Sequence, residues 1–90
     1  MRIKANYISK YIRSRRIELN LSQQKLTTSL GWNNRTTQYL SNIELGKCSF
    51  PSSYVNQLSS ALMVDKKIII DAMVKDFRDS LEREVIEDIK

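Results

Sequence analysis

Hydrophobic positions along the chain recur every three or four residues, and polar residues fill the intervals between them. This is the period of an amphipathic α-helix with one buried face, whereas the apolar–polar alternation of a half-buried strand is absent. The repeats are interrupted at Gly31, Gly46 and Pro51. Glycine is favoured where a helix ends and proline where one begins. The pattern therefore predicts an all-α chain of five helices.

Two short helices are predicted before the first glycine. The first spans about residues 6–19, with Asn6 as its N-cap. Asn20 follows it, and asparagine tolerates the left-handed conformation in which a helix often ends. The second begins after Ser22, a favourable N-cap, and ends at Gly31. Apolar residues at helical spacing give each helix one face for the core, namely Ile8, Ile12, Leu19, Leu26 and Leu30.

A third helix is predicted over residues 37–45, after a turn that is rich in asparagine. Thr36 is the expected N-cap of this helix, although the sequence also permits a start at Asn34. Leu40 and Ile43 point inward in a helix of this span, so the polar residues between them point outward. The resulting outward face consists of Thr37, Gln38, Ser41 and Asn42.

Two further helices are predicted towards the C-terminus, over residues 51–62 and 66–90. Pro51 is favoured in the first turn of the former, and Asp65 can cap the latter. A continuous last helix would be roughly 35–40 Å long, which is more than a domain of this size can cover. Its apolar stripe therefore needs a partner surface. That stripe consists of Ile69, Met73, Phe77, Leu81 and Val85.

The second and third predicted helices form a pair of short helices joined by a turn, and the outward face of the later one is small and polar. This is the arrangement of a helix-turn-helix unit, whose second helix enters the major groove of DNA. Amide and hydroxyl side chains can hydrogen-bond to base edges there. The same residue types are ordinary on a solvated helix, but their position favours DNA reading. The predicted base-reading residues are Thr37, Gln38, Ser41 and Asn42.

Residues suited to the phosphate backbone surround this predicted reading helix. Lysine and arginine side chains lie on the helix before it, in the turn and just after it. A side-chain amide at the start of the preceding helix can also hold a phosphate, together with backbone N–H groups. The predicted phosphate-contacting residues are Gln23, Lys25, Arg35, Thr36 and Lys47. Among the arginines of the first helix, the sequence leaves Arg13 and Arg15 undecided between the DNA backbone and solvent.

These motifs resemble the Xre/Cro/C1 helix-turn-helix family, and most nearly the DNA-binding domains of phage repressors and Cro proteins. The resemblance covers about residues 8–70 and rests on residues at fixed spacing: 16–23 (RIELNLSQ), Leu26, Gly31, 41–44 (SNIE), Gly46, Lys47 and Pro51. It implies a five-helix, lambda-repressor-like domain with an extended C-terminal helix. It also implies that Gln23 and Lys47 contact phosphates. Arg16 and Glu44 would form a structural ion pair between the first and third helices.

The turn at residues 32–35 is longer than is usual in that family. Asn33, Asn34 and Arg35 are therefore further candidates for DNA contact. Trp32 can stack on a base or cover the core beneath this turn, and we favour the cover because large aromatic rings bury well.

Charge supports the same interpretation. The 90 residues carry a net charge of +5, but residues 1–47 hold nine Lys and Arg against two Glu, whereas residues 48–90 hold six against eight acids. A basic half joined to an acidic half suits one surface that faces nucleic acid and one that faces away. We interpret residues 1–65 as the DNA-binding domain and residues 66–90 as a dimerisation helix of the same compact unit.

Several classes of protein are disfavoured by composition. With one cysteine and no histidine, an intrachain disulfide is excluded, and a Cys/His metal site is not expected. The sequence contains no Gly-rich phosphate loop and no nucleophile–base set, so we expect neither an enzyme nor a cofactor. It also has no apolar run of membrane-spanning length and no signal-peptide pattern. We therefore expect a cytoplasmic protein that does not contact a membrane.

The last helix has two interpretations. It can fold back over its own core, or it can pair with its twin across a two-fold axis, which we favour, with its acidic outer face away from DNA. The predicted function is a dimeric, sequence-specific regulator of transcription, a repressor of phage or mobile-element type that binds an inverted repeat. The alternative is a restriction–modification controller or antitoxin whose last helix binds a polymerase subunit or a toxin. An adaptor without DNA binding is a third class.

Overall fold

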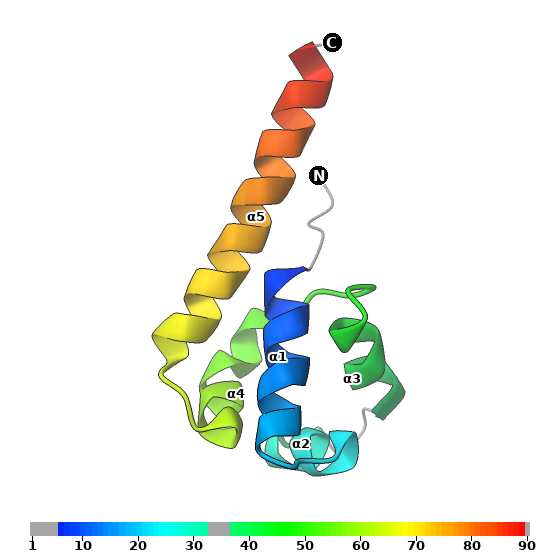
Figure 1. The fold of residues 1–90 in the computed structure, drawn as a ribbon, viewed down its shortest axis with the longest axis vertical. Coiled ribbons are helices and arrows are strands. Elements are labelled where there is room, and N and C mark those ends of the chain that lie inside the picture. Colours follow the sequence, from blue (N-terminus) through cyan, green and yellow to red (C-terminus); the bar gives the residue numbers. More distant parts are fainter. Residues whose placement is uncertain (1–5, 33–36, 90) are drawn as a thin grey trace.

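The computed structural model of the chain describes residues 6–32 and 37–89 (Figure 1). Within these residues the elements are five α-helices and one short 3₁₀ helix, with no strand. In chain order they are α1 (Tyr7–Glu18), α2 (Gln23–Ser29), α3 (Thr37–Glu44), η1 (Ser52–Tyr54), α4 (Val55–Leu62) and α5 (Lys66–Ile89). The prediction of an all-α chain of five helices with a long C-terminal helix is confirmed.

Most helix boundaries follow the predicted local signals. The hydroxyl of Ser22 accepts the backbone N–H three residues on, at 3.0 Å, and Asp65 Oδ1 accepts the N–H two residues on, at 2.9 Å. Asn20, Gly31 and Gly46 all have positive φ angles, of 56°, 75° and 78°. These are the left-handed stops that asparagine and glycine permit. Short polar side chains and glycines thus divide the first half of the chain as predicted.

The start of α4 differs from the prediction. Pro51 does not lie in the helix but is extended, with φ −69° and ψ 123°, and the 3₁₀ turn η1 separates it from α4. The α-helix itself begins only at Val55. Serine side chains compete with helical backbone hydrogen bonds, so the two serines after the proline favour a short, tighter turn.

The start of α1 is capped from the far end of the chain. The predicted N-cap Asn6 makes no side-chain capping hydrogen bond. Instead, Asp76 Oδ1 accepts the backbone N–H groups of Asn6 and Tyr7 at 3.0 and 2.7 Å, and its Oδ2 accepts that of Ile8 at 3.1 Å. Asp76 is 3% exposed. A carboxylate at this end also suits the helix dipole, so α5 is fastened to α1 by one buried side chain.

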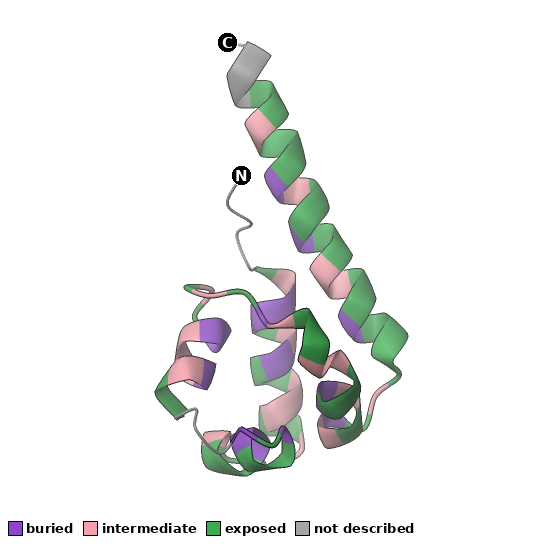
Figure 2. Cartoon of the chain, turned by 180° about the vertical axis from the view of Figure 1, so that it is seen from behind, coloured by how far each residue is buried: buried purple, intermediate pink, exposed green. Residues whose placement is uncertain are grey.

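The core lies between α1, α2, α3, α4 and the first half of α5. Figure 2 shows the buried residues along the inward faces of these helices. Its apolar members are Ile8, Ile12, Leu26, Leu30, Trp32, Leu40, Ile43, Phe50, Leu58, Leu62 and Ile69. Leu19, which the sequence analysis placed on the core face, is only half-buried. The other apolar residues that the sequence analysis placed on the core faces of the first three helices are all buried.

Helix α5 packs against α1 and α4 and then continues past them (Figure 1). The molecule is consequently elongated, with principal extents of 45, 25 and 22 Å. Ser80 is the last buried residue on α5 among those whose burial is described. In the figure, α5 and α3 lie on opposite sides of α1. No helix within the described residues is both long enough and apolar enough to cross a membrane.

The predicted apolar stripe of α5 does not stay on one side of the helix. Ile69 is 0% exposed and belongs to the molecule's own core, so its assignment to a dimer interface is wrong. Residues four apart drift by about 40° per step around a helix of 3.6 residues per turn. Met73 is therefore half-buried, whereas Phe77, Leu81 and Val85 are exposed, at 44%, 43% and 50%.

Candidate nucleic-acid interface

Helix α3 presents a polar outer face. Thr37 and Gln38 are exposed, and Ser41 and Asn42 are half-buried. The opposite face is apolar and closed, since Leu40 and Ile43 are both 0% exposed. A helix with one closed face has a fixed rotation about its axis. The four residues that the sequence analysis selected for base reading therefore share one side of one helix.

Two of these residues are joined to each other. Gln38 Nε2 donates to Asn42 Oδ1 at 3.1 Å, across one helical turn. The bond orders two amide side chains that would otherwise sample several rotamers in water. Amides are also the side chains that pair bidentately with adenine in the major groove. The outer face of α3 thus carries two neighbouring amides that can both donate and accept hydrogen bonds.

A buried ion pair fixes α3 to α1. Arg16 Nε donates to Glu44 Oε2 at 2.8 Å, and Arg16 Nη2 donates to Glu44 Oε1 at 3.0 Å. The third guanidinium nitrogen, Nη1, donates to the carbonyl of Leu21 at 2.8 Å. The two side chains are 13% and 3% exposed, respectively. This bidentate geometry is strong and directional, and it is the pair that the family resemblance implies.

Gln23 extends this network. Its Nε2 donates to Glu44 Oε1 at 3.3 Å, so the amide faces the ion pair as well as the protein surface. The sequence analysis assigned Gln23 to a phosphate contact, and that assignment stays a prediction. The structure adds that the same side chain links the start of α2 to the end of α3.

A polar hollow opens beside this network. It has a volume of about 170 Å³ and is lined by Arg13, Arg16, Gln23, Ser41, Glu44 and Leu45. Arg13, which the sequence left undecided, therefore lies beside the outer face of α3. Leu45 was not selected at all, although it is 58% exposed and follows Ser41 by four positions on the same face. Helical spacing from Ser41 could have identified it.

The other cations have different surroundings. Lys25 and Lys47 are both exposed. Lys47 follows the end of α3 in the sequence, and its backbone N–H donates to the carbonyl of Asn42 at 2.9 Å. Arg15 is instead a structural residue, because its Nε donates to the carbonyl of Leu62 at 3.0 Å, at the end of α4. Arg35 and Thr36, with Asn33 and the alternative helix start at Asn34, lie outside the described residues.

Trp32 is part of an aromatic cluster. Its ring lies 5.2 Å from that of Tyr39, 5.8 Å from that of Phe50 and 5.5 Å from that of Tyr54, measured between centroids. Trp32 is 4% exposed. Such tilted and edge-on pairs stabilise a core beyond their buried area. The interpretation of Trp32 as a buried core residue is confirmed.

Comparisons of this chain with models of protein families, with curated proteins and with solved structures find no match. Function is therefore inferred from the arrangement of side chains on and around α3. Among the described residues, no group of three or more His, Cys, Asp or Glu side chains could hold a metal ion. The outer face of α3 and the cations next to it are the polar features that remain to be explained.

Proposed function

We propose that this chain is a sequence-specific regulator of transcription that binds double-stranded DNA through a lambda-repressor-like helix-turn-helix. The observation that carries the proposal is the outer face of α3. Its exposed side is made of base-reading residue types, whereas its other side is closed by Leu40, Ile43 and the Arg16–Glu44 pair. A rigidly held helix with short polar side chains suits the major groove.

Phosphate contacts would come from the cations around this helix. Lys47 follows α3, Lys25 lies on α2, and Arg13 borders the polar hollow beside the end of α3. These cations neutralise backbone charge and set the register of α3 on the duplex, whereas the residues of its outer face choose the sequence. Helix α5 lies on the other side of α1, away from a duplex bound at α3 (Figure 1).

The regulator acts as a dimer in this proposal, and each copy reads one half of an inverted repeat. Two half-sites about one helical turn apart, roughly 34 Å, match a two-fold dimer of such heads. A protein bound to such an operator would exclude polymerase, and the regulator would therefore act as a repressor. We propose that it is of phage or mobile-element type and acts in the cytoplasm. The exposed apolar side of α5 would join the copies.

Selection from a pool of random duplexes tests this function. The purified chain is incubated with the pool at near-physiological salt, and the retained duplexes are sequenced. Asn42→Ala removes one base-reading amide, and Gln57→Ala is its matched control because Gln57 is an exposed amide on α4. We expect the unaltered chain and Gln57→Ala to enrich the same inverted repeat. Asn42→Ala should relax the preference at one base pair of each half-site.

Other results would contradict parts of the proposal. No enrichment, with only salt-sensitive retention, would mean that the basic surface binds DNA without reading sequence. An unchanged motif with Asn42→Ala would show that α3 is not the reading helix. A single half-site would support the reading head but contradict the dimer.

A further inference from the structure

Five of the exposed apolar residues of α5 form one continuous stripe, which we call the outer stripe. Its side chains are between 42% and 57% exposed. They differ from the predicted stripe in the first two positions, where the chain turns Ile69 and Met73 towards its own core. The members of the outer stripe are Ile70, Val74, Phe77, Leu81 and Val85.

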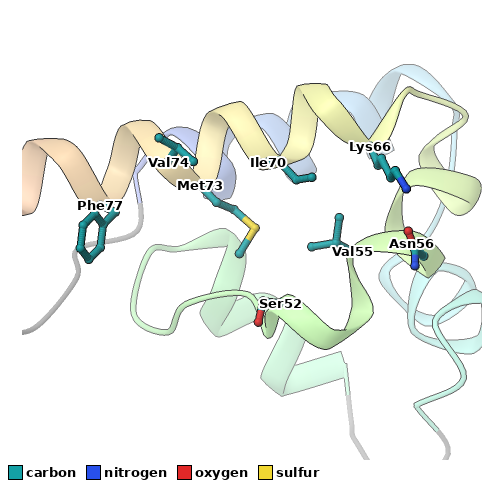
Figure 3. A pocket seen from close by; sticks show the side chains of 8 residues that line it. All are labelled: Ser52, Val55, Asn56, Lys66, Ile70, Met73, Val74 and Phe77. Atoms are coloured by element: carbon teal, nitrogen blue, oxygen red, sulfur yellow. The ribbon is translucent and has the colours of Figure 1, made fainter.

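The first half of the outer stripe borders a groove. Ile70, Val74 and Phe77, with Met73, form one wall of an apolar hollow of about 600 Å³. The other wall comes from η1 and α4, and Lys66 closes one end (Figure 3). That second wall is formed by Ser52, Val55 and Asn56. Figure 3 shows the side chains of Ile70, Met73 and Val55 directed into this space.

The second half of the outer stripe, Leu81 and Val85, belongs to the last turns of α5, and this end of the helix projects beyond the other helices (Figure 1). Apolar groups on a projecting helix are costly in water unless another surface covers them. One copy of the chain thus has an open apolar groove at one end of α5 and exposed apolar side chains at the other.

The spacing of the outer stripe is nearly the same in both directions. Its members are separated by four, three, four and four positions, so four of them are symmetric about the midpoint between residues 77 and 78. Ile70 mirrors Val85, and Val74 mirrors Leu81. A second α5 laid antiparallel on the first would therefore place these four apolar positions opposite one another, with Phe77 next to the two-fold axis. Such an interface is self-complementary and closes as a dimer.

Charge favours the same direction of pairing. Residues 66–77 carry three lysines and two aspartates, whereas residues 78–89 carry two arginines and five carboxylates. Antiparallel helices place the lysine-rich start against the acidic end, and parallel helices place acidic end against acidic end. A parallel coiled coil would also continue the heptad from Leu81 to Glu84 and Asp88, which would put carboxylates in its seam.

We propose that the outer stripe binds a second copy of this chain in antiparallel orientation, with Leu81 and Val85 of each copy seated in the groove of the other. The inference rests on the dimer of the proposed function and adds its direction, register and groove. The acidic end of α5 then lies beside Lys66 of the second copy. The projecting end of α5 in each copy binds in the groove of the other copy, so both grooves are occupied in the dimer.

Disulfide trapping tests the direction of pairing. All variants carry Cys48→Ser, and one set carries Ile70→Cys, another Val85→Cys. A disulfide forms only between residues whose Cα atoms lie about 4–7 Å apart. We expect an equal mixture of the two variants to yield a crosslinked heterodimer on oxidation, whereas each variant alone yields none. The matched control mixes Ile68→Cys with Ile86→Cys, two exposed residues on a different side of α5, which should not crosslink.

Sedimentation of two neighbouring variants tests the surface itself. Val85→Asp should convert the dimer to a monomer, and Ile86→Asp should not, although the two side chains are 50% and 57% exposed. Because both lie on the projecting part of α5, helical circular dichroism should be unchanged. Homodimeric crosslinks of either single cysteine variant would overturn the antiparallel pairing.

A chain that stays monomeric at all concentrations would overturn this inference, as would a dimer that survives Val85→Asp. Dissociation of the second copy by a different protein that occupies the groove would instead favour the toxin or polymerase partner. These failures are distinguishable from failure of the proposed function. Selection of a single half-site from random duplexes would keep DNA reading by α3 even without a dimer.

Discussion

The outer face of α3 and the outer stripe of α5 are both exposed, but they differ in chemistry. The face of α3 is polar and lies on a helix whose other side is closed by the core. The outer stripe is apolar, and its second half lies on a helix that projects from the body (Figure 1). A polar face is stable in water, and hydrogen bonds determine which partner it binds. An apolar face is stabilised when any surface of complementary shape buries it.

The two helices are also fastened differently. Helix α3 is held by a bidentate ion pair, Arg16 with Glu44, and α5 by the Asp76 carboxylate that caps α1. Both fastenings join residues far apart in the sequence. Four variants therefore test the two helices separately. They remove the ion pair, one amide of the outer face of α3, the cap of α1 and one lysine next to α3.

The largest effect is expected from Glu44→Ala. It leaves the Arg16 guanidinium, whose side chain is 13% exposed, without its carboxylate, and loss of one partner of such a buried pair costs about 3–5 kcal/mol. Urea unfolding followed by circular dichroism measures the loss. The control is Glu18→Ala, since Glu18 pairs with Arg15 but is 64% exposed. Its loss should be under about 1 kcal/mol. Equal midpoints for both variants would contradict a structural role for the ion pair.

The next largest effect is expected from Gln38→Ala. We expect binding to the selected duplex to weaken by about 1–3 kcal/mol, with stability and sedimentation unchanged. The change also removes the hydrogen bond to Asn42, so the preference read by that amide should broaden. Gln24→Ala, at an exposed position on α2, is the control and should bind like the unaltered chain. If Gln38→Ala changed the oligomeric state instead, the two surfaces would not be independent.

Much of the region up to Leu62 was predictable because its signals are local. Helical apolar spacing predicts the burial of Ile12, Leu26 and Leu40, and the positive φ angles of Asn20 and Gly31 follow from residue type. The outer face of α3 follows from the same periodicity. Its relation to the polar hollow does not, because Arg13 and Gln23 reach that hollow from other helices.

The errors in α5 have physical causes. The predicted stripe takes a four-residue repeat as one face, but this repeat winds around the helix, so Ile69 lies in the core and Val85 is exposed. Asp76 belongs to the last helix, whose acids the sequence analysis assigns to an outer face. Its burial depends on where the start of α1 meets α5. No local pattern records a contact between residues about seventy positions apart.

A moderate effect is expected from Asp76→Ala. The variant deprives three N–H groups at the start of α1 of their acceptor, and loss of a helix cap costs about 1–2 kcal/mol. The urea midpoint should fall, and amide hydrogen exchange should quicken at Tyr7 and Ile8. Asp71→Ala is the control, because Asp71 is exposed on the same helix. Unchanged exchange at the start of α1 would show that the cap does not stabilise this contact.

The smallest effect is expected from Lys47→Ala. Lys47 is exposed and follows α3 by three positions, and the proposed function assigns its ammonium group to a phosphate and not to a base edge. Loss of one phosphate contact should reduce the slope of log affinity against log salt by about 0.9. Affinity should fall to a similar degree for all duplexes, because a phosphate contact carries no sequence information. Lys67→Ala, an exposed lysine on α5, is the control and should leave the slope unchanged. A loss confined to one base position would instead make Lys47 a reading residue and extend the polar face of α3 beyond its last turn.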